Sequence, residues 1–177
     1  MTYQDVAVGD NPPNDVNIII EVQKGGGQNK YEFDKNTGRL TLDRVNGTTA
    51  TYPADYGFIP GTLCGDGDPL DAMLIIDEPV VHGTVVPARP IGILYMIDDG
   101  EADEKLVCVP RDDISKDHIK KIEDFDPNFK KRVEFFYKNY KAWKNSWQGT
   151  PVEYKGWGDA EDAKKTIAES IERYKNS

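Results

Sequence analysis

The residue pattern changes from strand-like to helix-like near Pro110, and this change restricts the fold more than any other feature of the sequence. Before it, short runs of β-branched or alternating polar and apolar residues are separated by turn residues, which is typical of short strands. After it, apolar residues recur at intervals of three and four, as on one face of a helix. Strands followed by helices predict an α+β domain built on a closed sheet or barrel.

The expected strands are short and are bounded by turn-forming residues. They cover residues 16–22, 30–33, 39–43, 51–59, 73–76, 84–96 and 105–109. Asn36-Thr37-Gly38 predicts a hairpin between the second and third of these strands. Pro87 and Pro90 predict a bent or edge strand within residues 84–96. The acidic segment 98–103 is expected to be a hairpin loop.

The helical part contains two segments with one apolar face each. The first face comprises Phe129, Val133, Phe136, Tyr140 and Trp143. The second comprises Ala160, Ala163, Ile167, Ile171 and Tyr174. We expect one more short strand between them, at residues 151–157, and we expect both helices to pack outside the strands.

The chain has 177 residues, enough for one domain with its own core. We predict a single domain, residues 1–177, in which residues 1–15 form a surface arm around Pro12-Pro13. No apolar run is long enough to span a membrane, and the first residues lack the pattern of a secretory signal. With only two cysteines, the chain is expected to be cytoplasmic. The net charge of −9 argues against a nucleic-acid partner, because Lys and Arg drive that binding.

Three aspartates lie close together in Asp66-Gly67-Asp68-Pro69-Leu70-Asp71, directly before an apolar run. Asp, Gly and Pro all form turns, so a solvated turn accounts for this segment taken alone. A cation site is the alternative, because closely spaced carboxylates repel one another unless a hard metal ion neutralises them. The segment does not fit a helix–loop–helix calcium site, because the sixth loop position is Asp71 rather than glycine.

Other polar residues along the chain favour the cation site. Further carboxylates occur at Glu21, Glu32, Asp98 and Asp103. Interleaved with them are cations and phenols at Lys30, Arg44, Tyr52, Tyr56, Lys105, Tyr140 and Lys141. Carboxylates suit magnesium, and Lys and Arg suit phosphate oxygens, so the combination fits phosphoryl transfer. Each residue also has an ordinary interpretation, because an alternating strand exposes one polar face and a helical tyrosine is often part of the core.

Several motifs resemble the soluble family I inorganic pyrophosphatases. They are Asp66-Gly67-Asp68-Pro69-Leu70-Asp71, the segments 52–60 and 105–110, Lys30-Tyr31-Glu32, and Phe135-Phe136 with Tyr140-Lys141. The resemblance runs from about Val16 to the C-terminus and is to the compact bacterial type. It implies a five-stranded closed β-barrel of the OB type, with additional short strands and helices outside. It also implies a cytoplasmic hydrolase of phosphate metabolism that converts pyrophosphate to two phosphates, typically as a homo-hexamer.

The resemblance further implies a role for each candidate residue. Asp66, Asp71 and Asp103 would hold the activating Mg²⁺ ions, and Asp98 with Asp103 would hold metal that arrives with the substrate. Asp68 would accept a proton from the attacking water, and Tyr56 would also lie in the site. The phosphate groups would be bound by Lys30, Arg44, Lys105, Tyr140 and Lys141. Glu21 and Glu32 would act mainly through water molecules around the metal, and Tyr52 would line the pocket.

Two positions depart from the family pattern. The segment Asp98-Asp99-Gly100-Glu101-Ala102-Asp103 differs from relatives after its first aspartate, although the spacing to Lys105 is kept. Cys64 stands where a small or polar residue is usual, which suggests redox sensitivity. Two other functions remain as alternatives, namely a non-catalytic OB-type module for single-stranded nucleic acid and a calcium-binding structural domain. The acidic clusters and the negative charge count against the first of them.

Overall fold

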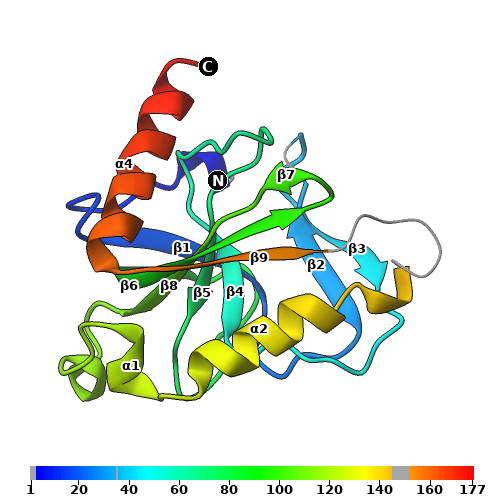
Figure 1. The fold of residues 1–177 in the computed structure, drawn as a ribbon. Coiled ribbons are helices and arrows are strands. Elements are labelled where there is room, and N and C mark those ends of the chain that lie inside the picture. Colours follow the sequence, from blue (N-terminus) through cyan, green and yellow to red (C-terminus); the bar gives the residue numbers. More distant parts are fainter. Residues whose placement is uncertain (1–2, 35, 145–151) are drawn as a thin grey trace.

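The computed structural model describes residues 3–34, 36–144 and 152–177 (Figure 1). The strands are β1 (Val16–Val22), β2 (Asn29–Phe33), β3 (Leu40–Val45), β4 (Asp55–Phe58), β5 (Asp71–Leu74), β6 (Val85–Asp98), β7 (Glu101–Ala102), β8 (Lys105–Pro110) and β9 (Glu153–Gly158). The helices are α1 (Ile122–Phe125), α2 (Phe129–Asn139) and α4 (Ala160–Lys175), with short 3-10 turns at Tyr3–Asp5 and Ile114–Lys116. The expected order of strands followed by helices is therefore confirmed.

Five strands form a closed ring. β1 pairs with β4, β4 with β5, β5 with β8, β8 with β6, and β6 returns to β1. All of these pairs are antiparallel except β5 with β8, which is parallel. β7 and β9 extend the sheet from β6, whereas β2 and β3 form a separate hairpin. The α+β class is confirmed, with the five-strand ring as its centre.

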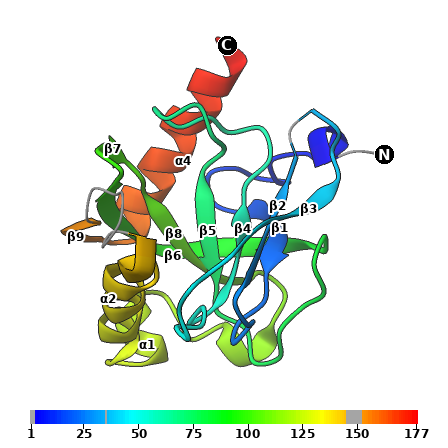
Figure 2. The ribbon, with the colours of Figure 1, turned by 90° about the vertical axis from the view of Figure 1, so that its right-hand side faces the viewer.

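The ring buries apolar side chains on both of its faces because residues alternate along each strand. On β8, Val107 belongs to one buried cluster, which α2 completes with Phe129, Val133 and Phe136. Leu106 belongs to the other cluster, to which α4 contributes Ala163 and Ile167. In both views α4 lies above the strands and α2 lies below them (Figures 1 and 2). None of the helices in the described ranges is long and apolar enough to cross a membrane.

β6 is a central strand, and not the edge strand that its prolines allowed. It pairs with β1 at Val85–Ala88, and then with β8 from Ala88 onward. The register of the second pairing shifts between Pro90 and Gly92. The strand therefore accommodates its prolines where it passes from one partner to the next.

The segment 98–103 is a tight hairpin, in which Asp98 pairs with Glu101. The two turn residues, Asp99 and Gly100, have φ values of 51° and 88°. Two consecutive positive φ values are typical of a two-residue hairpin turn, for which Asp-Gly is a favoured sequence. The expected six-residue loop is thus a two-residue turn, because Asp98 ends β6 and Glu101–Ala102 form β7.

Other boundaries differ by a few residues. The strand expected at 51–59 is only β4, and the first long helix ends at Asn139 with Tyr140 as its C-cap. β9 starts at Glu153, and Pro151 of the expected strand lies outside the described residues.

Within the N-terminal segment, the Tyr3 ring contacts the rings of Phe33 and Phe58 at centroid distances of 5.9 and 5.2 Å. The single-domain reading of the chain remains a prediction.

Candidate active site

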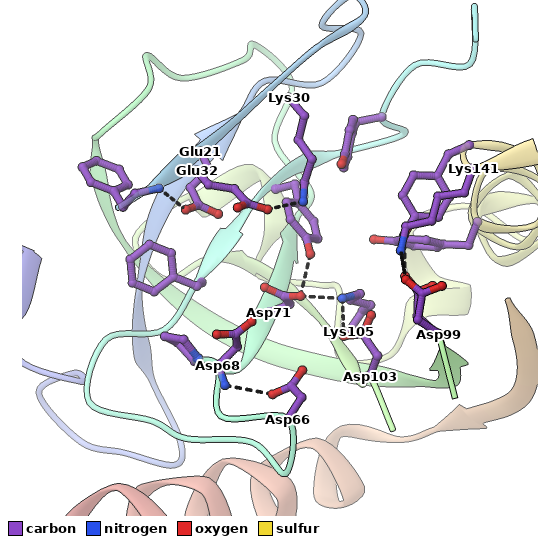
Figure 3. Close-up of a pocket in the computed structure, with 18 of the residues that line it drawn as sticks. Glu21, Lys30, Glu32, Asp66, Asp68, Asp71, Asp99, Asp103, Lys105 and Lys141 are labelled. Atoms are coloured by element: carbon purple, nitrogen blue, oxygen red, sulfur yellow. Dashed lines mark hydrogen bonds and ion pairs between the residues drawn. The ribbon is translucent and has the colours of Figure 1, made fainter. Parts of the chain in front are cut away.

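A cavity of about 330 Å³ opens between the strand ring, the β2–β3 hairpin and the end of α2 (Figure 3). Its walls contain all fourteen residues that the sequence suggested for a site. They are Glu21, Lys30, Glu32, Arg44, Tyr52, Tyr56, Asp66, Asp68, Asp71, Asp98, Asp103, Lys105, Tyr140 and Lys141. These residues are spread over 121 positions of the chain, so the fold rather than sequence proximity brings them together.

Lys105 lies at the centre of the site. Its ammonium group is buried at the start of β8 and donates to the carboxylates of Asp71 and Asp103 (Figure 3). Burial alone would lower the lysine pKa, but these two carboxylates raise it well above its usual range. The lysine is therefore charged at neutral pH. The Tyr56 hydroxyl donates to Asp71 Oδ2 at 2.6 Å, so this carboxylate oxygen serves two donors.

A second group of interactions joins Asp98, the last residue of β6, to the residues that follow α2. The Tyr140 hydroxyl donates to Asp98 Oδ2 at 2.8 Å, and the Lys141 ammonium donates to the same oxygen. Burial raises the pKa of Asp98, but the hydrogen bonds from Lys141 and Tyr140 outweigh it, and the net shift is downward. Asp98 is therefore ionised. Its other oxygen, Oδ1, is buried and has no hydrogen-bond partner among the described residues.

Another wall of the cavity is formed by residues of β1 and of the β2–β3 hairpin. Glu21 Oε1 accepts a hydrogen bond of 2.8 Å from the backbone N–H of Phe33. Burial nevertheless raises the pKa of Glu21 to about 8. Lys30 forms an ion pair with Glu32 on the same strand. Arg44 lies 3.2 Å from Asp43 and donates to Asn46 Oδ1 at 3.3 Å.

The Asp66–Asp71 segment is a loop anchored at both ends. At its start, the backbone N–H of Cys64 donates to the Asp68 carbonyl at 2.7 Å. Towards its end, Leu70 is fully buried, and its N–H donates to Thr62 Oγ1 at 2.9 Å. Asp66 Oδ1 accepts from the backbone N–H of Asp68 at 2.9 Å. The segment is thus a turn, and it also forms part of the cavity wall. The cation site stays a prediction.

The comparison with protein families agrees with this arrangement. The model of the inorganic pyrophosphatases matches residues 18–175. The chain belongs to the inorganic pyrophosphatase family. An inorganic pyrophosphatase of Agrobacterium fabrum is 42% identical over 177 residues, which cover 99% of this chain and 98% of the relative. One of Nostoc sp. is 45% identical over 163 residues, covering 92% and 94%.

Solved structures of the family have the same fold. The inorganic pyrophosphatase of Thermus thermophilus superimposes with a TM-score of 0.93 at 38% identity and covers 99% of both chains. That of Neisseria gonorrhoeae gives a TM-score of 0.89 at 35% identity, over 98% of this chain and 99% of the relative. The match to bacterial pyrophosphatases along nearly the whole length confirms the predicted compact bacterial type. Family membership implies dependence on divalent metal ions.

The donor set of the cavity suits a hard divalent ion, because its potential ligands are carboxylate oxygens. Among the described residues, no three carboxylate, histidine or cysteine side chains are already grouped as a metal site. Two ammonium groups lie among the potential ligands, Lys105 against Asp71 and Asp103, and Lys141 against Asp98. Asp98 Oδ1 is buried, and no described residue uses its lone pairs. The residues therefore fit divalent ions, provided that these ions compete with the lysines.

The cavity also contains residues that the sequence did not identify as part of the site. Two are carboxylates on the β6–β7 hairpin, Asp99 and Glu101, and a third is the phenol of Tyr137 on α2. Asp99 lies 3.4 Å from the Lys141 ammonium (Figure 3). The Asp-Gly turn signal could have predicted that Glu101 lies opposite Asp98. Tyr137 had no such signal, because it follows Phe136 directly and lies beside the apolar face expected from the helical spacing.

Proposed function

We propose that this protein hydrolyses inorganic pyrophosphate to two phosphates, with Mg²⁺ as the activating ion and Asp68 as the proton acceptor. The observation that carries the proposal is the composition of the cavity in a member of this family. Nine carboxylates and four cations line one cavity, so both metal ions and phosphate groups find ligands there. A binding module for single-stranded nucleic acid would instead need a positively charged groove with stacking aromatic rings.

The proposed metal ligands are Asp66, Asp71, Asp98 and Asp103. Bound Mg²⁺ would neutralise phosphate charge and make the attacking water more acidic. Asp68 then removes the proton of this water, which is the usual task of a carboxylate acting as general base. Glu21 and Glu32 complete the acidic wall and would act mainly through water molecules there. Glu21 suits this role in its protonated form too, since a carboxylic acid both donates and accepts hydrogen bonds.

The proposed substrate ligands surround the carboxylates. They are Lys30, Arg44, Lys105, Tyr140 and Lys141, together with Tyr56, and Tyr52 lines the wall behind them. Lysine and arginine form charge-assisted hydrogen bonds to phosphate oxygens, which are stronger than neutral ones. Because several of these cations lie against carboxylates, substrate and metal binding are expected to be coupled.

Three further features belong to the same proposal. The five-strand ring is the OB-type barrel implied by the sequence resemblance, and residues 1–15 are a surface arm of a single domain. The chain assembles as a homo-hexamer. The protein acts in the cytoplasm on a small-molecule substrate, with neither nucleic acid nor a membrane as partner.

Phosphate release from pyrophosphate tests the proposed activity directly. We expect release with Mg²⁺, and none above background after chelation with EDTA. Size-exclusion chromatography with light scattering tests the hexamer independently. A purified, folded protein that releases no phosphate with any of Mg²⁺, Mn²⁺ or Zn²⁺ would refute the proposed activity.

A further inference from the structure

A buried side-chain amide lies behind the cavity wall, directly after β3. Asn46 is only 6% exposed, and it is not part of the described lining of the cavity. Its Oδ1 atom accepts a hydrogen bond from Arg44 Nε at 3.3 Å. Burying an amide is unfavourable unless its polar atoms are hydrogen-bonded, so a buried asparagine calls for an explanation. The contact with Arg44 connects Asn46 to a cavity residue that we propose to bind phosphate.

The surroundings of Asn46 fix its position. Its backbone N–H donates to the Gln28 carbonyl at 2.8 Å, which joins it to the residue before β2. The next residue, Gly47, lies against the Trp143 ring, where the end of β3 meets the segment that follows α2 (Figure 1). A β-carbon on Gly47 would lie 2.9 Å from Trp143 Cδ2, an atom shared by both rings of the indole, so the face of the indole covers the glycine. Asn46 is therefore fixed through its own backbone and through Gly47, and it offers Arg44 an acceptor in a defined position.

The Arg44 guanidinium is held from behind. It carries its five donor hydrogens on three nitrogens in one plane. Nε donates to Asn46, and Nη1 lies 3.2 Å from Asp43 Oδ2. Arg44 lines the cavity whereas Asn46 does not, so the bond from Nε approaches the guanidinium from the side away from the substrate. The Nη nitrogens can then donate two parallel hydrogen bonds to a phosphate group.

We propose that Asn46 is a positioning residue for the substrate: its amide oxygen fixes the plane of the Arg44 guanidinium, so that both Nη groups are presented to one phosphate group. A free arginine side chain adopts many rotamers, and ordering it lowers the affinity for a ligand. The hydrogen bond from Nε provides part of that ordering before the substrate binds. This inference rests on the proposed function, since it takes Arg44 as a phosphate ligand.

Two substitutions of Asn46 test the proposal, because together they separate the hydrogen bond from the packing. Asn46→Ala removes the acceptor and leaves a space, whereas Asn46→Leu removes the acceptor and fills the space. We expect both variants to raise KM for pyrophosphate in excess Mg²⁺ about tenfold, the effect of one hydrogen bond to a charged group, with a smaller change in kcat. Circular dichroism and the melting temperature show whether each variant is folded. Asn17→Ala is the matched control and should keep the wild-type KM, because the Asn17 amide donates to the Ala7 carbonyl outside the cavity.

A double substitution shows whether Asn46 acts through Arg44. In an Arg44→Met background, Asn46→Leu should leave KM unchanged, because residues that act through one another are not additive. A further rise in KM in that background would overturn the proposal. So would a wild-type KM in both single variants, a rise in only one of the two, or failure of both to fold. A folded wild type that does not hydrolyse pyrophosphate would instead refute the proposed function, and the inference with it.

Discussion

At the scale of single residues, the three aspartates of the 66–71 segment differ in their surroundings although they are close in sequence. Asp71 lies on β5 and accepts from Tyr56 and Lys105, whereas Asp66 and Asp68 lie on the loop before it. The Asp71 Oδ2 atom therefore already accepts hydrogen bonds from an ammonium and a phenol. Asp68 is the candidate base among the three, in agreement with the family pattern.

We expect Asp68→Asn to lower turnover by about 10²- to 10⁴-fold, the usual effect of removing a general base. The amide has almost the same shape, so the circular dichroism spectrum and Mn²⁺ affinity should change little. Phosphate release at saturating Mg²⁺ measures the effect. Asp112→Asn, at an exposed carboxylate outside the cavity, serves as the control. Near-normal turnover of Asp68→Asn would assign the proton transfer to another group.

The two thiols are expected to be inert in the folded protein. Cys64 and Cys108 are both buried, and burial raises the pKa of each to about 12. Because the pKa is raised, the reactive thiolate is scarce below that pH, roughly one part in ten thousand at pH 8. Iodoacetamide at pH 8 should therefore modify neither residue until the protein is unfolded. The burial of Cys64 thus argues against the redox sensitivity that its sequence position suggested.

Mass spectrometry of peptides after timed labelling distinguishes the two thiols. Rapid modification of Cys64 in the folded protein, with loss of activity, would contradict this expectation and restore the redox hypothesis. Labelling in urea provides the positive control for both sites.

At the scale of secondary-structure elements, α4 is the clearest case of a helix specified by its own sequence. Its N-cap, Asp159, accepts hydrogen bonds from the N–H groups of Glu161 and Asp162 at 2.8 and 3.0 Å. The Asp162 carboxylate accepts from the Asp159 N–H in return, which completes a capping box. Ala163 and Ile167 then bury the apolar face against the strand ring. Local capping and long-range packing therefore favour the same boundary.

Asp159→Ala should lower the free energy of unfolding by about 1 kcal/mol, because the first turn of α4 loses its side-chain acceptor. Urea unfolding followed by circular dichroism measures the loss. Asp159→Asn should keep most of the stability, since an asparagine side chain also caps helices well. An alanine variant as stable as the wild type would show that the packing of α4 alone defines its start. Activity should change little in either variant.

At the scale of the whole molecule, the cavity concentrates the negative charge of an acidic protein. Of its ionisable side chains, nine are carboxylates and only four are cations. The strands that carry them are far apart in sequence and converge at one end of the ring. Such an arrangement repels a polyanion unless metal ions bind as well. From the charge of the site we therefore expect substrate to bind only together with metal ions.

We expect metal-free protein to bind free pyrophosphate hardly at all. Calorimetric titration of pyrophosphate into EDTA-treated, dialysed protein should give no measurable heat of binding at neutral pH. Addition of Mg²⁺ should restore binding, with Ca²⁺ as a comparison ion. Tight binding without metal would mean that the carboxylates do not face the substrate, and the assigned site would be wrong.

The sequence by itself determined much of this protein, because its strongest signals are local. Alternation with period two and spacing of three to four depend only on neighbouring residues, so they predicted most strands, both long helices and the α+β class. The motif around Asp66 and the Tyr140-Lys141 pair predicted the family, which the comparison confirmed. All fourteen candidate side chains also proved to line one cavity, although their individual roles stay predictions.

Only the tertiary structure decided which groups contact one another. Gly57 is an example, because a β-carbon there would lie 1.9 Å from the carbonyl oxygen of Ile19 on the neighbouring strand. No local pattern contains that contact. Likewise, the position of Lys105 between two carboxylates and the burial of Tyr137 depend on strands and a helix that are distant in sequence. Periodicity predicts which side of a strand or helix faces the core. It does not predict which strands pair or which charged side chains neutralise one another, because those contacts form only when distant elements pack together.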